Sequence, residues 1–163
     1  MGIVNVTPDS FSDGGKFFTL ESAYKQSIKL INDGADIIDI GGESSRPGSK
    51  PVTIERELKR TIPLVSKIRS KYPDAVISID TTKSKVAEQA ILSGANIIND
   101  ISGLSYDENM GEVASNYDVP LVIMHMQGKP ENMQDSPYYN DLIQDIKSFF
   151  EERIRYATQF GIQ

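Results

Sequence analysis

Five short apolar segments alternate with amphipathic segments along this 163-residue chain, and this alternation constrains the fold more than any other feature. The apolar segments are rich in Ile and Val and are mostly apolar on both faces. They span residues 2–6, 35–40, 75–79, 96–101 and 120–126. Strands of a parallel sheet have this composition because both of their faces are covered. The sequence therefore predicts five buried parallel strands.

The intervening segments place apolar residues at helical spacing. These patterns run over residues 20–31, 58–68, 86–91, 110–117 and 142–157. Thr19 is the expected N-cap of the first helix, and Gly34 and Gly94 are expected stops. Pro63 lies inside the second pattern and should kink that helix or mark the end of a short first one. A strand followed by a helix, five times over, predicts an α/β fold with right-handed crossovers.

An internal repeat favours a barrel over an open sheet. Residues 34–39 read GADIID and residues 94–99 read GANIIN, an offset of 60 residues or two strand–helix units. In a closed (β/α)₈ barrel, alternate strands fill the same interior layer, so a repeat across two units suits that architecture. The alternative is that this pattern is a general helix-to-strand junction, which would recur in any α/β protein.

Composition limits the classes of function. The chain has no Cys and one His, which excludes a disulfide framework, thiolate chemistry and a metal site of several His. A net charge of −6 gives nucleic acid no general attraction. No apolar run reaches the ~18 residues of a membrane span, and no segment resembles a signal peptide. We expect a single-domain cytoplasmic protein that binds neither nucleic acid nor membranes.

Polar residues follow every predicted strand at its carboxyl end. They are Asn5, Asp39, Asp80, Asn99, Asp100, His125 and Gln127. Parallel α/β folds build their ligand sites at this edge, so we expect a site there. Helix capping is the competing explanation for Asp80, and we expect Thr81 or Thr82 to cap the third helix. Asn99 lies between aliphatic residues, so its amide requires either a structural hydrogen bond or a ligand.

The segment GGESSRPGS at residues 41–49 has the composition of an anion-binding loop. Its glycines expose backbone N–H groups, its serines add hydroxyls, and Arg46 carries a forked set of donors suited to phosphate oxygens. The segment is neither a Walker motif nor a dinucleotide fingerprint. On composition alone, a solvated loop explains it equally well.

Together these segments resemble dihydropteroate synthase, an enzyme of folate biosynthesis. The matching motifs are MGIVNVTPDSFSDGG (1–15), DIGGESSRPG (39–48), SIDT (78–81), INDISG (98–103) and MHMQGKPENMQ (124–134). The resemblance implies a TIM (β/α)₈ barrel, of which residues 1–163 would form the first five β/α units as one pterin-binding domain. It also implies a Mg²⁺-dependent transferase that is a target of sulfonamides. The implied reaction condenses 6-hydroxymethyl-7,8-dihydropterin diphosphate with 4-aminobenzoate, giving 7,8-dihydropteroate and diphosphate.

The resemblance assigns residues to the two organic substrates. Asp80 and Asn99 correspond to pterin-binding groups, and Met124 corresponds to a residue that lines the pterin pocket. Phe11 and Pro47 correspond to walls of the aminobenzoate pocket. A carboxylate and an amide are suitable partners for the N–H donors and ring nitrogens of a pterin.

The resemblance also assigns residues to the diphosphate and to catalysis. Asn5 corresponds to a contact of both Mg²⁺ and diphosphate, and Ser45 and Arg46 correspond to diphosphate contacts. The family usually has Thr where Ser45 stands, so the hydroxyl is kept. Asp13 corresponds to a first-loop carboxylate that helps to stabilise a cationic pterin intermediate. The resemblance therefore implies that Asp13 and Arg46 are the catalytic residues.

A barrel of this class typically needs about 250 residues. We therefore expect an N-terminal fragment that is inactive alone. The resemblance also implies that the full-length form is a homodimer. Two other readings fit parts of the sequence. One is the pterin-binding barrel domain of a methyltetrahydrofolate:corrinoid methyltransferase, which would share Asp80 and Asn99 but not the first two loop motifs. The other is a non-catalytic fragment that binds a partner.

Overall fold

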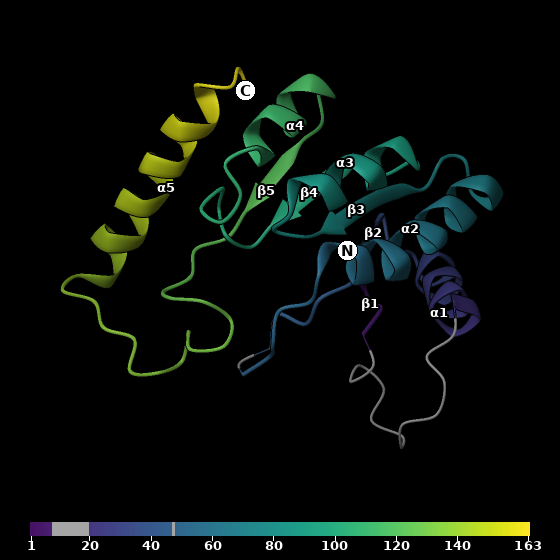
Figure 1. The fold of residues 1–163 in the computed structure, drawn as a ribbon, viewed down its shortest axis with the longest axis horizontal. Helices are drawn as coiled ribbons and strands as arrows, with labels where there is room; N and C mark the ends of the chain where they lie inside the picture. The colour runs from purple at the N-terminus through teal and green to yellow at the C-terminus, as the bar shows by residue number, and fades with distance from the viewer. Residues whose placement is uncertain (8–19, 47) are drawn as a thin grey trace.

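The structure is a computed structural model, and it describes residues 1–7, 20–46 and 48–163. Strands and helices alternate throughout these residues (Figure 1). The strands are β1 (Gly2–Asn5), β2 (Ile37–Gly41), β3 (Val76–Asp80), β4 (Ile97–Asp100) and β5 (Leu121–Ile123). The helices are α1 (Leu20–Asn32), α2 (Ile54–Lys71), α3 (Ser84–Leu92), α4 (Met110–Asn116) and α5 (Leu142–Thr158). The predicted alternation is confirmed, with ends shifted by a few residues.

All five strands form one parallel sheet whose spatial order, β1-β2-β3-β4-β5, is the chain order. Each right-handed crossover between adjacent strands places its helix on the same face. Figure 1 shows α1 to α4 ranged along that face, with α5 beyond α4 at the C-terminal end. A doubly wound sheet would reverse its strand order at a switch point, so this topology is that of a barrel segment. None of the helices in the described residues is both long and apolar enough to cross a membrane.

The core lies between the sheet and these helices. One face of each of the first four strands points into it, with Val4, Ile38, Ile40, Ile77, Ile79 and Ile98 at most 1% exposed. The opposite face of the sheet has exposed apolar side chains: Ile3 is 61% exposed, Val76 is 37% exposed and Val122 is 42% exposed. The prediction of strands covered on both faces is therefore wrong for this chain by itself. The open face carries the polar residues that build the candidate site.

Helix α2 shows where packing outweighs local preference. Thr53 is its N-cap, and the Thr53 hydroxyl accepts a hydrogen bond from the Arg56 backbone N–H at 3.4 Å. The helix continues through Pro63, so of the two alternatives, a kink or a short first helix, the second is wrong. Proline inside a helix costs about 3 kcal/mol. Fully buried Leu64, Val65 and Ile68 supply enough packing against the core to offset this cost.

The ends of α1 and α3 test three further predictions. Gly34 and Gly94 follow these helices with φ of +95° and +113°, which confirms them as left-handed stops. Lys83 is the N-cap of α3 and makes no capping bond with its side chain, so the expected capping by Thr81 or Thr82 is wrong. Asp107 accepts from the Ser84 N–H instead, at 2.8 Å, from the segment after β4. Thr19 lies outside the described residues.

Candidate active site

Three predicted site residues lie in one row across the carboxyl ends of the strands. The parallel register pairs Asn5 with Gly41, Gly41 with Asp80, and Asp80 with Asn99. Paired residues of neighbouring strands share a face, so all four lie on the open face. A Cβ added to Gly41 would lie 3.2 Å from Asp80 Oδ2 and 3.3 Å from Asn5 Oδ1. Because Gly41 has no side chain, a space is left between the side-chain oxygens Asn5 Oδ1 and Asp80 Oδ2, and we call this space the Gly41 cradle.

Asp39 and Ser78 lie one step below this row, paired with each other in register. Asn99 Nδ2 donates a hydrogen bond to Asp39 Oδ2 at 3.2 Å, which joins alternate strands β2 and β4. Asp39 and Asn99 are the last residues of the two repeat segments, so the repeat brings residues of two alternate strands into contact, as expected for a barrel interior. Asp39 Oδ1 and Ser78 Oγ are buried and have no hydrogen-bond partner among the described residues.

An unsatisfied buried polar group costs about 1–3 kcal/mol, so these two atoms are candidate ligand contacts. From the sequence, Asp39 was recognised only as a polar strand end, and Ser78 was missed altogether. The strand period of two could have found both, because it places them on the face of Asp80 and Asn99.

Asp80 has the most strongly perturbed carboxyl group of the described residues. Burial raises its pKa to about 7, with further contributions from the negative charges of Asp39, Glu57, Asp100 and Glu43. Near neutral pH this carboxyl group therefore exists in both protonation states. It ends β3 and caps no helix, which removes the competing explanation for this residue.

The segment after β2 presents the predicted anion-binding residues. Ser45 and Arg46 are exposed, while Ser44 and Ser49 brace the loop through a hydrogen bond from Ser49 Oγ to the Ser44 carbonyl at 2.5 Å. No salt bridge to Arg46 occurs within the described part of the chain. The Arg46 guanidinium group is therefore available for a ligand.

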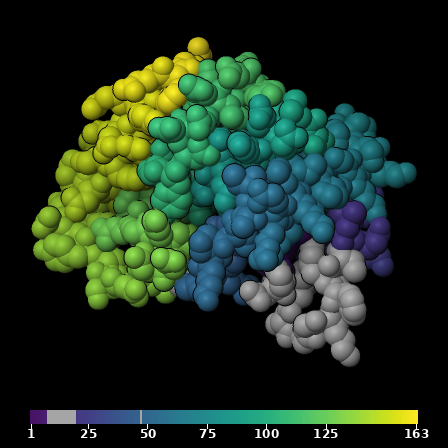
Figure 2. Space-filling model, viewed as in Figure 1, coloured from purple at the N-terminus to yellow at the C-terminus, as the bar shows by residue number. Residues whose placement is uncertain are grey.

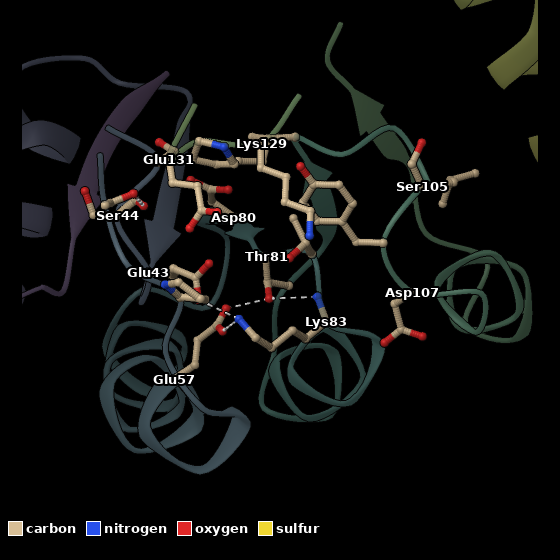
Figure 3. Close-up of a pocket in the computed structure, with 18 of the residues that line it drawn as sticks. Glu43, Ser44, Glu57, Asp80, Thr81, Lys83, Ser105, Asp107, Lys129 and Glu131 are labelled. Carbon is tan, nitrogen blue, oxygen red and sulfur yellow. Dashed lines mark hydrogen bonds and ion pairs between the residues drawn. The ribbon is translucent and has the colours of Figure 1, made fainter. Parts of the chain in front are cut away.

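An ion network lies directly behind this loop (Figure 3). Lys83 Nζ lies 2.7 Å from Glu43 Oε2 and 2.6 Å from Glu57 Oε2, and Thr81 Oγ1 donates to Glu57 Oε1 at 2.5 Å. Burial by itself would lower the pKa of Lys83, but the hydrogen bonds to both carboxylates outweigh it and raise that pKa. Sequence reasoning missed this network, since its three charged residues are far apart in the chain.

A cleft of about 1080 Å³ opens beside Asp80, between the loops that follow β2, β3, β4 and β5. Among the residues lining it are Glu43, Ser45, Lys83, Asp107 and Lys129. Figure 2 shows the blue segment after β2 meeting the green segment after β5. At this junction the Gly48 N–H donates to the Pro130 carbonyl at 3.2 Å. Asp80 thus belongs to both the cleft and the strand-end row.

The other predicted site residues fall in three places. Asn5 and Asn99 lie in the row outside the cleft lining. Met124 immediately follows β5 and is 38% exposed. Phe11, Asp13 and Pro47 lie outside the described residues, so their roles stay predictions. Within residues 1–7, 20–46 and 48–163 there is no group of three or more His, Cys, Asp or Glu able to hold a metal ion.

Parallel strands in chain order, with polar residues gathered at their carboxyl ends, define the class: an α/β-barrel protein with a small-molecule site at the usual catalytic edge. The chain belongs to the pterin-binding enzyme family, because the family profile described as "Pterin binding enzyme" matches residues 1–163. The predicted fold class is confirmed as the first five β/α units of a (β/α)₈ barrel.

Relatives with curated sequences or solved structures agree with this assignment. Dihydropteroate synthase of Escherichia coli strain K12 is 46% identical over 99% of this chain and 57% of its own length. That of Synechocystis is 44% identical over 99% of this chain and 56% of its own length. The Yersinia pestis dihydropteroate synthase, solved with a sulfonamide drug complex, has a TM-score of 0.93 and 44% identity, with 100% of this chain and 58% of that chain covered.

A Xanthomonas albilineans dihydropteroate synthase with 4-aminobenzoic acid has a TM-score of 0.89 and 42% identity, with coverage of 100% and 57%. This chain therefore spans somewhat over half the length of the relatives it matches.

Proposed function

We propose that the full-length gene product is a dihydropteroate synthase and that this chain forms its pterin-binding part. The observation that carries the proposal is the strand-end row of Asn5, Gly41, Asp80 and Asn99, with the unsatisfied Asp39 carboxylate beneath it. The reaction breaks the bond from the pterin methylene carbon to the diphosphate oxygen. It forms a bond from that carbon to the amine nitrogen of 4-aminobenzoate, and the amine loses one proton.

The pterin is expected to bind against Asp39, Asp80 and Asn99. Its amino and ring N–H groups are donors, and two carboxylates with one amide offer a surplus of acceptors. Met124, on the segment after β5, contributes an apolar, adaptable wall. A site that hydrogen-bonds its substrate in this way rejects analogues that lack the donors.

The diphosphate is expected to bind at Ser45, Arg46 and Asn5. Arg46 is exposed in the loop after β2, and its guanidinium group can meet phosphate oxygens with two parallel N–H bonds. Mg²⁺ commonly uses one or two protein oxygens together with substrate phosphates, and the Gly41 cradle offers such a donor set in Asn5 Oδ1 and Asp80 Oδ2. When bound, the ion would neutralise charge on the leaving group.

We also propose the remaining roles that the family resemblance implies. Phe11 and Pro47 form walls of the 4-aminobenzoate pocket, and Asp13 stabilises positive charge on the pterin methylene. The 4-aminobenzoic acid and sulfonamide structures of relatives support an aminobenzoate site of this kind. A cytoplasmic location and a homodimeric full-length protein complete the proposal.

The test is calorimetry followed by turnover, both on the full-length gene product. The pterin diphosphate should bind in the presence of Mg²⁺, and adding 4-aminobenzoate should release diphosphate in a coupled assay. Asp80→Ala should abolish pterin binding while Asp74→Ala, on the exposed turn before β3, should not. Binding of methyltetrahydrofolate without aminobenzoate-dependent diphosphate release would instead support a methyltransferase domain. No heat with either pterin would support a non-catalytic fragment.

The 163-residue chain by itself is proposed to be inactive. Sustained diphosphate release by the purified chain would refute this part of the proposal alone.

A further inference from the structure

We infer that Lys83 is a positioning residue: it holds the described part of the loop after β2, residues 43–46 and 48–52, and this loop in turn sets the affinity for the diphosphate end of the substrate. This inference rests on the proposed function. Lys83 precedes α3 and does not belong to the loop it holds. Figure 3 shows its side chain extended between Glu43, at the start of the loop, and Glu57, on α2.

The anchor point is a buried carboxylate. Glu57 is fully buried, and its two oxygens are satisfied by Lys83 Nζ at 2.6 Å and Thr81 Oγ1 at 2.5 Å. Glu57 also sits in a helix that packs on the core. Lys83 is therefore fixed at its charged end by a group that cannot move without opening the core.

The second carboxylate transfers this rigidity to the loop. Glu43 Oε2 accepts from Lys83 Nζ at 2.7 Å and from the Val52 backbone N–H at 2.8 Å. The Glu43 carboxylate thus ties the first residue of the loop to Val52, the last. Ser45 and Arg46, the proposed diphosphate contacts, lie within the segment that this bond closes.

The local charge balance separates Lys83 from direct phosphate binding. One ammonium group faces two carboxylates, so the three side chains together carry a charge of −1 and offer no free cation. If the ammonium group were removed, Glu43 would face Glu57 without a counter-charge, and repulsion would displace Glu43 because Glu57 is buried. Arg46 would then lose its fixed position although its own side chain is unchanged.

The experiment compares two ligands on four variants of the full-length protein. The ligands are 6-hydroxymethylpterin with and without its diphosphate group, and the variants are Glu43→Ala, Lys83→Arg, Lys83→Met and, as control, Lys85→Met. Lys85 is exposed in the first turn of α3, two residues after Lys83. Loss of well-placed hydrogen bonds between Arg46 and the diphosphate should weaken binding of the diphosphate form about 10- to 100-fold in Glu43→Ala and Lys83→Met.

Both variants should change the affinity for the ligand without diphosphate by no more than about twofold. A change this small would not indicate that a binding group is misplaced. Lys83→Arg should recover most of the affinity, and Lys85→Met should match the wild type. Equal weakening of both ligands would show that the network is merely structural, and unchanged binding of both would also refute the inference. Because Lys83→Met leaves a buried carboxylate unpaired and can prevent folding, the milder Glu43→Ala carries the test independently.

Hydrogen exchange of the ligand-free protein distinguishes failure of this inference from failure of the proposed function. The Val52 amide donates to Glu43, so Glu43→Ala should accelerate its exchange while leaving core amides of β3 protected. Should the wild type bind neither pterin, the proposed function fails and the exchange result alone decides the positioning role. Unchanged Val52 exchange would then overturn it.

Discussion

Replacing Asp80 with asparagine should stabilise the protein, and the gain should depend on pH. The carboxyl group of Asp80 has a pKa of about 7 in the folded protein against a usual value of 3.8, because of burial first and the charge of Asp39 second. Below pH 3.8 both folded and unfolded states carry the proton, and the residue has no effect on the free energy of unfolding. The amide side chain of the variant would be neutral at every pH.

As the pH rises from 3.8 toward 7, the unfolded chain loses this proton while the folded protein keeps it. The folded state then binds more protons, so its stability falls with rising pH in this window. Each unit of pKa difference corresponds to about 1.4 kcal/mol, which puts the upper limit at about 4 kcal/mol. Relaxation of the site reduces such values, so we expect Asp80→Asn to be about 2–4 kcal/mol more stable at pH 8.

Urea unfolding between pH 4 and 8 measures this difference. Tyrosine fluorescence can report it, since the chain has seven Tyr and no Trp. The free energies of unfolding of wild type and Asp80→Asn should coincide near pH 4 and separate toward pH 8. Asp74→Asn, at an exposed position, should follow the wild type within about 0.5 kcal/mol throughout. A stability difference that did not vary with pH would show that burial and charge do not act on Asp80 as argued.

Three further predictions concern two residues that support the loops of the site and one proposed diphosphate contact. Gly42→Ala should cost about 1–3 kcal/mol in unfolding free energy, because its Cβ would lie 2.9 Å from Cγ of the immobile Glu57; an unchanged urea midpoint would contradict this. Asp107→Ala removes the acceptor for the Ser84 N–H and should cost about 1 kcal/mol, measured in the same way. Arg46→Met should change stability by less than about 0.5 kcal/mol yet abolish calorimetric binding of inorganic diphosphate; retained binding would refute its role.

The arrangement of the strands could be predicted because it follows from local patterns. Each predicted apolar segment contains a strand, and left-handed glycines end α1 and α3 where expected. The 60-residue repeat carried long-range information as well, since its last residues, Asp39 and Asn99, bond to one another. Asn5, Asp80 and Asn99 could be placed together because strand register aligns their ends.

The supports of the site could not be predicted from the sequence in this way. Lys83 lies 40 residues from Glu43 and 26 from Glu57, and no periodicity links them. The cap of α3 comes from Asp107 in another loop, so the local Thr81 and Thr82 gave a wrong expectation. Interactions of this kind depend on how loops meet at the sheet edge, and that meeting is fixed by the packed fold.

The site's own electrostatics indicate how a substrate should be oriented. At the strand ends, the carboxylates of Asp39 and Asp80 face one amide donor, Asn99, and one Asp39 oxygen has no partner among the described residues. Such a surface favours a ligand rich in N–H donors, and binding one would lower the pKa of Asp80 by stabilising its charged form. Both carboxylates would repel an anionic group placed against them unless a bound cation such as Mg²⁺ lay between.

The negative end of the substrate must therefore point toward the loop after β2. Lys83 is neutralised by Glu43 and Glu57, whereas the exposed Arg46 carries a forked set of donors that can receive this negative end. A molecule with a donor-bearing ring at one end and a diphosphate at the other satisfies both demands at once. At about pH 6 the Asp80 carboxyl group is mostly protonated, so binding of the pterin diphosphate through Asp80 should release a proton. If no proton were released, the ring would not be bound by Asp80 and this orientation would be wrong.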